Sequence, residues 1–406
     1  MRRFICIVSA FTLLLAGCVK NEPLTSGGQE PKAEIAFESP IVAPKAKSVQ
    51  EIASGFPTTL DMKVWGFYSE TQYPAVDATN HTVGSHNYML GALYENDENK
   101  GAVWGCSEKG YYWPHSGYLH FVAFAPAAPA GGLTASAVTD EGLQLTGYTV
   151  PDEADEDLLV SQVAYSQTKP ANPEDGAPIL FDHALTSVVF NVKSGVYGDR
   201  SGSDQSRIDT DIRIVKIEVI DARATGDFSQ QMTSWNNEQM AAASTEKGWT
   251  VADNALTKDF TAYDGTAYDG LLLTDAYQSV HDLANAEDGY SLTNLILLPQ
   301  QLKDNVILKV TYDMTYTGLA ELNGVGELWI EDQVVQLQLN QCDIKEWLRG
   351  YRYSYNLTIE LNRIICSTEV AQWSDEDDAS GEIESPDDVS GKDESGDFGT
   401  DSSFNN

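Results

Sequence analysis

The sequence has few cysteines, few basic residues and no apolar run long enough to cross a membrane. Five cysteines occur among the 406 residues, and none forms a Cys-x-x-Cys pair or a Cys/His spacing typical of a metal site. The apolar run at residues 4–15 is shorter than the ~20 residues that span a bilayer. Lys and Arg number 25 against 61 Asp and Glu, a formal net charge of −36. This charge excludes nucleic acid as a partner, because phosphate binding needs basic side chains.

Motifs of catalysis are also missing. The chain has no phosphate-binding loop, no dinucleotide fingerprint and no Gly-x-Ser-x-Gly nucleophile motif. The six histidines are scattered, and we interpret each as a polar surface or edge residue. The acidic run at residues 152–157 is interpreted as a solvated loop, with a calcium site as the alternative. We therefore expect no enzyme activity, no metal site and no cofactor.

The N-terminus has the parts of an export signal. Arg2 and Arg3 precede the short apolar run, and small residues follow it. Residues 15–18 (LAGC) resemble the lipobox of bacterial lipoproteins, in which the cysteine is acylated and becomes the new N-terminus. We predict lipidation of Cys18, with an ordinary signal peptide as the alternative. The mature protein is then outside the cytoplasm and tethered by lipid chains.

Three cysteines remain after the signal is removed and Cys18 is acylated. These are Cys106, Cys342 and Cys366, an odd number in a compartment that permits disulfides. Cys342 and Cys366 form a disulfide in one interpretation, and all three stay free thiols in the other.

Hydrophobic periodicity indicates an all-β protein. Residues 351–361 alternate almost perfectly, with Tyr351, Tyr353 and Tyr355 on one face and polar side chains on the other, which is typical of an antiparallel sheet. Short helices are predicted only at residues 236–243 and 274–284. The other strand predictions are residues 34–38, 61–68, 118–124, 158–164, 180–192, 212–220, 295–298, 306–316 and 328–339.

Composition divides the chain into segments. The last 33 residues hold twelve Asp or Glu and one Lys, so they cannot bury enough apolar surface to offset the entropy of ordering. A Gly/Ser/Asp-rich stretch at residues 198–204 is the best linker. We predict a signal peptide at 1–17, a flexible spacer at 18–32, an N-terminal β-sandwich domain at 33–200, a C-terminal β-sandwich domain at 201–373 and a disordered acidic tail at 374–406.

Several motifs together resemble the fimbrillin family, the lipoprotein pilus subunits of Bacteroidales. The motifs occur in the family's order and spacing and cover residues 33–373. We interpret them as turns, core anchors and strands. The matching segments are residues 110–114 (GYYWP), 118–126 (YLHFVAFAP), 157–160 (DLLV), 180–185 (LFDHAL), 298–302 (LPQQL) and 350–353 (GYRY).

The resemblance implies two transthyretin-like β-sandwich domains in tandem and assembly by donor-strand exchange. In that scheme a trypsin-like surface protease removes the N-terminal strand, and a neighbouring subunit's C-terminal strand fills the exposed groove. Ile35 and Phe37 are the inward-facing pair of the displaced strand, and Lys45 and Lys47 mark the expected cut. The candidate donor strand carries the alternating residues Ile364, Cys366, Thr368 and Val370.

Two features depart from the family pattern. The family's cut usually follows an arginine, but no arginine occurs between Arg3 and Arg200, so only a cut after lysine fits. The family's donor strand ends in a short terminus, whereas this chain continues into an acidic tail. The tail favours a pilus tip or anchor subunit. In a further alternative, both end strands stay in their own domains and the protein is a monomeric lipid-anchored surface protein. It would then bind glycan or host protein through aromatics such as Trp104, Tyr111 and Tyr112.

The expected partners and location follow from these interpretations. The partners are other pilus subunits, a trypsin-like surface protease, the outer membrane through the lipid on Cys18, and a host or bacterial surface receptor. The protein is expected first as an outer-membrane lipid-anchored precursor and then in a cell-surface fimbrium.

Overall fold

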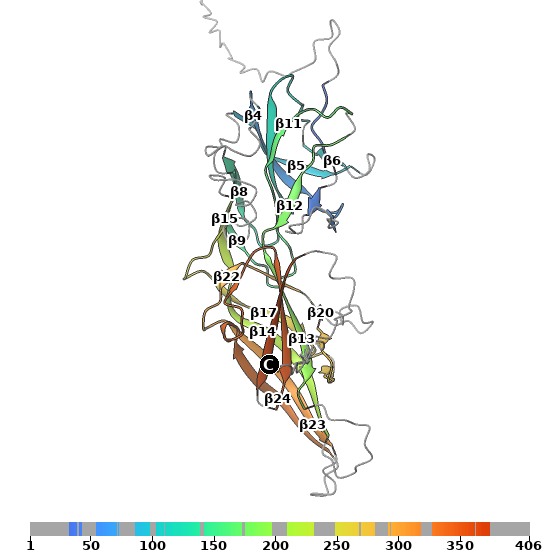
Figure 1. Cartoon of the computed structure of the whole chain (residues 1–406), viewed down its shortest axis with the longest axis vertical. Coiled ribbons are helices and arrows are strands. Elements are labelled where there is room, and N and C mark those ends of the chain that lie inside the picture. The colour runs from blue at the N-terminus through green and yellow to red at the C-terminus, as the bar shows by residue number, and fades with distance from the viewer. Residues whose placement is uncertain are drawn as a thin grey trace, which may run out of the picture.

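The computed structural model shows an elongated, almost entirely β molecule (Figure 1). It describes residues 32–373 apart from gaps, of which the longest are 43–53, 73–85, 197–208, 231–247, 281–290 and 318–326. Within the described part, no helix has the length and apolar character needed to cross a bilayer. The all-β prediction is confirmed, because the described residues contain no α-helix.

The first sheet has ten strands and forms one end of the molecule (Figure 1). Its hydrogen-bonded order is β1-β6-β5-β4-β7-β10-β12-β2-β3, with β11 added against β7. The strands are β1 (Phe37–Glu38), β2 (Ile41–Val42), β3 (Ser54–Gly55), β4 (Met62–Ser69), β5 (His86–Asn96), β6 (Val103–Cys106), β7 (Tyr118–Ala125), β10 (Leu159–Ser161), β11 (Ala164–Gln167) and β12 (Leu180–His183).

A four-stranded sheet, in the order β16-β15-β9-β8, lies between the two ends of the molecule (Figure 1). Its outer strands are only partly buried, whereas β9 contributes large core side chains such as Tyr148. The strands are β8 (Thr134–Val138), β9 (Gly142–Thr149), β15 (Thr225–Ser229) and β16 (Trp249–Thr250).

Three further sheets build the other end. A five-stranded sheet has the order β19-β13-β26-β27 with β21 on β13, and a six-stranded sheet has the order β20-β17-β14-β23-β24 with β18 on β14. The five-stranded sheet contains β13 (Thr186–Ser194), β19 (Gln278–Ser279), β21 (Leu295–Leu297), β26 (Tyr351–Ile359) and β27 (Ile364–Gln372). The six-stranded sheet contains β14 (Asp209–Arg223), β17 (Thr257–Asp264), β18 (Leu271–Leu272), β20 (Ser291–Leu292), β23 (Ile307–Thr317) and β24 (Glu327–Gln338). The small pair is β22 (Gln300–Gln301) with β25 (Glu346–Trp347), next to the 3-10 turn η2 (Leu339–Gln341).

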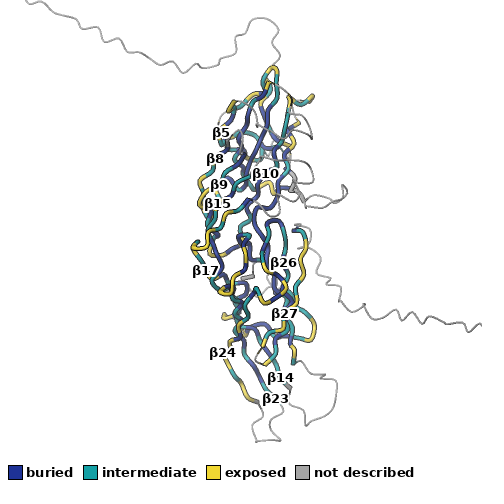
Figure 2. Tube along the Cα trace, turned by 60° about the vertical axis from the view of Figure 1, so that its left-hand side comes forward, coloured by how far each residue is buried: buried dark blue, intermediate teal, exposed yellow. Residues whose placement is uncertain are grey.

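The first sheet separates two hydrophobic cores, which we call the N-terminal core and the central core. Alternate side chains of β7 face opposite ways: Leu119, Phe121 and Ala123 enter the N-terminal core, whereas Val122 and Phe124 enter the central core. Both faces of β7 are therefore covered, which explains its nearly continuous apolar sequence. The central core continues through the other sheets, and Figure 2 shows buried residues along most of the molecule.

Most strand predictions correspond to strands of the structure. The predicted strands 306–316 and 351–361 match β23 and β26 closely. The predicted helix at 236–243 lies outside the described residues. The helix predicted at 274–284 is wrong where it is described, because Gln278 and Ser279 form β19 and pair with β13.

The predicted single strand at 180–192 is two strands that belong to different sheets. The chain leaves the first sheet at Ala184 and Leu185, and β13 then pairs in parallel with β26 from Ser187↔Arg352 to Ser194↔Ile359. β13 thus lies among strands of the C-terminal half, although it precedes the predicted boundary. The linker at 198–204 lies outside the described residues, and the two-domain division at residue 200 stays a prediction.

The β13–β26 pair predicts a stability effect. Phe190 of β13 is fully buried and stacks on Tyr355 of β26 at 5.5 Å between ring centroids. We expect Phe190→Ala to lower the free energy of unfolding by about 3–5 kcal/mol, because it leaves a cavity in the central core. Leu256→Ala is the control, since Leu256 is 56% exposed, and it should change stability by less than about 0.5 kcal/mol. Equal losses in urea titrations of the two variants would contradict this account.

Candidate functional site

The N-terminal segment (residues 33–38) lies between two parts of the ten-stranded first sheet. On one side, the Ile35 N–H donates to the Tyr111 carbonyl at 2.7 Å, and the Trp113 N–H donates to the Ala33 carbonyl at 3.0 Å. Phe37 of β1 pairs with Trp104 of β6 on the same side. Another extended chain could in principle make main-chain bonds of the same kind in place of the segment.

The other side of the N-terminal segment contacts the chain just before β12. The Ala177 N–H donates to the Ala36 carbonyl at 2.7 Å, and the Glu38 N–H donates to the Ala177 carbonyl at 3.2 Å. A Cβ at Gly176 would overlap the main chain of Phe37 and Glu38. Glycine at this position therefore permits the close approach that lets one segment bridge both edges of the sheet.

The predicted inward-facing pair is deeply buried. Ile35 is 2% exposed and Phe37 is 0% exposed. The Phe37 ring makes edge-to-face contacts with Tyr94 at 4.9 Å and Phe121 at 5.0 Å between centroids. Removal of the segment would uncover an apolar groove that includes Tyr94 and Phe121, which contact the Phe37 ring, and Trp104 of the same core.

The candidate donor strand is β27, an outer strand of the five-stranded sheet. It pairs antiparallel with β26 from Tyr351↔Gln372 to Ile359↔Ile364 and is last in the sheet order. Ile364 and Cys366 are partly buried against the central core, and Thr368 is half-buried. Val370 departs from the expected pattern, because it is 52% exposed. β27 is therefore buried much less than the N-terminal segment.

Trp373, directly after β27, makes a contact that the sequence did not predict. It is 5% exposed and stacks on the His183 ring with centroids 4.0 Å apart. His183 Nδ1 lies 2.6 Å from Asp157 Oδ2, and the Trp373 N–H donates to the Gly350 carbonyl. This site fixes the end of the candidate donor strand against the first sheet. The only sequence signal was the position of Trp373 at the boundary with the acidic tail.

A buried ion pair lies close to this contact. Arg349 Nη2 is 3.6 Å from Asp182 Oδ2, and both side chains are about as buried as core residues, at 7% side-chain exposure each. Burial lowers the pKa of Arg349. Asp182 belongs to β12 and Arg349 precedes β26, so the pair links the two ends of the molecule. The sequence did not predict that either residue is buried, because a charged residue in or near a strand normally faces solvent.

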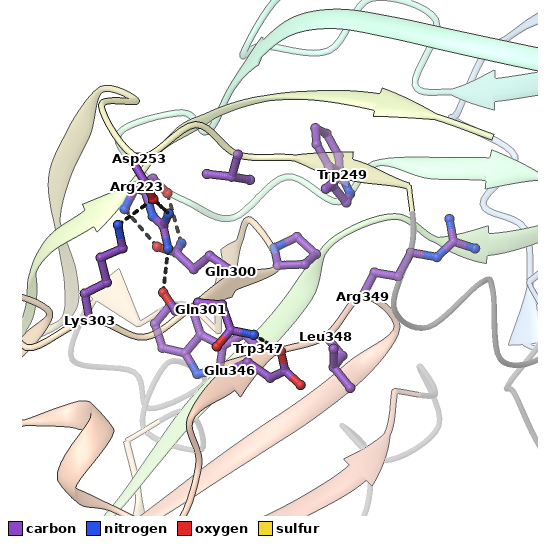
Figure 3. Close-up of a pocket in the computed structure, with 12 residues that line it drawn as sticks. Arg223, Trp249, Asp253, Gln300, Gln301, Lys303, Glu346, Trp347, Leu348 and Arg349 are labelled. Atoms are coloured by element: carbon purple, nitrogen blue, oxygen red, sulfur yellow. Dashed lines mark hydrogen bonds and ion pairs between the residues drawn. The ribbon is translucent and has the colours of Figure 1, made fainter. Parts of the chain in front are cut away.

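A half-open cavity of about 340 Å³ lies beside β22 and β25 (Figure 3). Lys303 Nζ contacts Asp253 Oδ1 at 2.5 Å, and the Arg223 guanidinium donates to the Gln301 carbonyl at 2.5 Å. The buried Gln300 amide accepts from the Arg223 N–H at 3.0 Å. These polar groups bond mainly to one another across the cavity wall, so the arrangement stabilises the fold around β22 and β25.

Two histidines depart from the prediction that all are surface or edge residues. His120 is 0% exposed in β7, where its Nδ1 accepts a hydrogen bond from the Ser166 N–H at 3.1 Å. His183 is 3% exposed and belongs to the Trp373 contact. His86 and His115 are exposed as expected. The prediction failed because a strand covered on both faces buries even its polar positions.

The acidic run at 152–157 does not converge on a common point. Asp152 Oδ1 contacts Lys258 Nζ at 2.6 Å, the Ala130 N–H donates to Glu156 at 2.7 Å, and Asp157 contacts His183. Among the described residues, no group of three or more His, Cys, Asp or Glu side chains is placed to hold a metal ion.

The aromatics proposed for glycan stacking lie in different environments. Trp104 is fully buried, and its Nε1–H donates to the Leu60 carbonyl at 3.0 Å, so it is unavailable to a surface sugar. Tyr111 is half-buried and Tyr112 is 38% exposed. The predicted residues Cys18, Lys45 and Lys47 lie outside the described residues.

Comparisons with known proteins show which family and which solved structures the chain resembles. The model of the fimbrillin-like family matches residues 71–373. A fimbrial protein from Bacteroides vulgatus is 15% identical, with 84% of this chain and 99% of that chain covered and a TM-score of 0.49. The C-terminally truncated tip fimbrial protein Mfa3 from Porphyromonas gingivalis is 10% identical, with 84% and 100% covered and a TM-score of 0.32. No curated protein matches the sequence.

Gly176 gives a direct test of the close approach. We expect Gly176→Ala to destabilise the protein by about 1–3 kcal/mol through overpacking and to speed amide exchange at residues 35–38. Gly105→Ala in β6 is the matched control, because a Cβ there meets no heavy atom within 4 Å. The measurement is amide hydrogen exchange by mass spectrometry. Unchanged exchange in the Gly176 variant would show that the close approach does not hold the segment.

His120 predicts a pH dependence of stability. Burial lowers its pKa from the ordinary 6.5 to about 4. The unfolded state therefore binds the proton first, so stability is fully present above pH 6.5 and falls as pH drops toward 4, by up to about 3 kcal/mol. We expect His120→Asn, whose amide oxygen keeps an acceptor for Ser166, to remove this part of the slope. Parallel curves for wild type and variant between pH 4 and 6.5 would contradict the assignment.

Proposed function

The chain belongs to the fimbrillin-like family, whose model matches residues 71–373, and on that premise we propose that it is a structural and adhesive pilus subunit. It is exported as a lipoprotein and assembled by donor-strand exchange after proteolysis. The observation that carries the proposal is the N-terminal segment, which fills a deep apolar groove and is held by main-chain hydrogen bonds on both sides. No enzymatic activity is part of this function.

Lipid on Cys18 delivers the precursor to the outer membrane. A trypsin-like surface protease then cuts after Lys45 or Lys47. The cut separates β1 and β2 from the rest of the chain, because both precede these lysines. β1 and β2 lie near opposite edges of the first sheet, so their loss opens the sheet and exposes the groove.

The driving force for exchange is a difference in burial between two sites. One is the position of β27 in its own sheet, and the other is the groove that the N-terminal segment fills. In its own sheet, β27 buries only parts of Ile364, Cys366 and Thr368, and it leaves Val370 exposed. In the groove of a neighbouring subunit, the alternating side chains would replace Ile35 and Phe37, which are almost fully buried. Burial of apolar surface contributes about 25 cal/mol per Å², so transfer from the shallow site to the deep one is favourable.

A terminal pilus subunit, at the tip or at the anchor, is the second candidate function. The acidic tail begins directly after Trp373, and Trp373 holds the end of β27 against His183. A subunit whose β27 stays in place would end the polymer. The N-terminal residue of the protein on the cell surface separates an anchor, which keeps Cys18, from a cleaved subunit.

The experiment combines cleavage with charged substitutions in β27. Purified precursor, kept reduced with dithiothreitol, is digested with trypsin, and the products are examined by N-terminal sequencing and by gels in mild detergent. We expect cleavage after Lys45 or Lys47 followed by a ladder of oligomers. Ile364→Asp combined with Val370→Asp should abolish the ladder and leave the monomer folded, because a charge is strongly disfavoured in an apolar groove.

Ile365→Asp is the matched control for these variants. Ile365 lies on the opposite face of β27 and is 47% exposed, so the charge remains in water and the ladder should persist. Cleaved and reduced wild-type protein that stays monomeric would rule out strand exchange. A normal ladder from the Ile364/Val370 variant would rule out β27 as the donor.

A further inference from the structure

Cys342 and Cys366 lie together at the start of the candidate donor strand. Their Sγ atoms are 2.7 Å apart, which is within roughly 0.7 Å of the ~2.04 Å length of a covalent disulfide. Cys342 follows the turn η2 and is 5% exposed, whereas Cys366 is partly exposed in β27. The two sulfur atoms are therefore already neighbours in the folded chain.

The pair joins β27 to a part of the molecule that stays behind if β27 leaves. η2 connects β24 to the stretch before β25, and its Leu339 is fully buried in the central core. The Leu339 N–H donates to the Val306 carbonyl at 3.0 Å, and the Cys342 N–H donates to the Leu339 carbonyl at 3.2 Å. Cys342 therefore belongs to a fixed element, and Cys366 belongs to an edge strand of shallow burial.

We propose that Cys342 and Cys366 form a disulfide in the exported protein, and that this disulfide fastens β27 to its own subunit until it is reduced. The inference rests on the proposed function for the role of β27 in assembly, but the disulfide itself does not depend on that role. A strand tied covalently near one end and stacked through Trp373 at the other cannot be transferred to a neighbour. Reduction would remove the first of these two attachments.

The oxidation is a thiol–disulfide exchange with an oxidised dithiol oxidoreductase of the exporting compartment. The more exposed Cys366 attacks the oxidant's disulfide, whose S–S bond breaks as a mixed disulfide forms. Cys342 Sγ then attacks Cys366 Sγ, and the mixed disulfide breaks. Two electrons and the two thiol protons pass to the oxidant, which leaves as a dithiol.

The test begins with the full chain exported by a Gram-negative host. Thiols are alkylated under denaturing conditions without reductant, and the labelled cysteines are identified by mass spectrometry. We expect Cys106 to be labelled and Cys342 and Cys366 to appear as one cross-linked peptide pair that is lighter by two hydrogens. Labelling of all three cysteines would overturn the inference.

Amide hydrogen exchange then tests whether the bond fastens β27. Exchange at residues 364–372 should be slower in the oxidised protein than in protein reduced with dithiothreitol or in the variants Cys366→Ser and Cys342→Ser. Cys106→Ser is the matched control, because Cys106 lies in β6 of the first sheet, and it should keep the slow exchange. Equal exchange in oxidised and reduced protein would overturn the fastening even if the disulfide forms.

Polymer formation separates this inference from the proposed function. After trypsin cleavage, we expect loss of the oligomer ladder in oxidised protein and its recovery on reduction or in Cys366→Ser. A ladder of equal strength in oxidised and reduced protein would overturn the inference. If β27 exchanges slowly only when oxidised, but no ladder forms in either state, the disulfide stands and the proposed assembly by β27 fails.

Discussion

The first sheet depends on the hydrogen bonds that residues 33–38 make on two sides. An exposed sheet edge is a row of unpaired main-chain groups, and proteins normally cover it. Here a single segment pairs with β6 on one side and forms main-chain hydrogen bonds with the chain just before β12 on the other. Phe37 of this segment fills the core beneath it. Gly176 makes this possible, since any side chain there would meet the main chain of the segment. Sheet closure, core completion and the candidate groove are thus consequences of one short strand.

The two ends of the molecule are connected by more than chain continuity. β13 follows β12 after two residues yet pairs with β26 in a different sheet, and the central core includes side chains from both ends. The Asp182–Arg349 ion pair and the Trp373–His183 stack lie at the same junction. Removal of one member of a buried ion pair is strongly destabilising. Side-chain contacts therefore join the two ends at this junction in addition to the main chain.

Local pattern was sufficient for most strands, but not for their pairing. Alternation identified β26 and β23, and the inward positions of Ile35 and Phe37 were right. The break at Ala184–Leu185 was invisible, because the apolar sequence is continuous while the two strands enter different sheets. The proximity of Cys342 and Cys366, and the Trp373 contact, arise from long-range packing that periodicity does not encode. The same reason explains the buried His120, since only the tertiary structure covers both faces of β7.

The parallel pairing of β13 with β26 also has a consequence for the order of folding. Thr186 of β13 bonds to Tyr351 across 165 residues of sequence, and folding slows as contacts become less local. Before β26 is available, β13 can pair only with the short strands β19 and β21, and β27 pairs with β26 afterwards as the outermost strand. The C-terminal half therefore stays incomplete until nearly the whole chain has been made. Until then, the five-stranded sheet lacks the strand that joins β13 to β27.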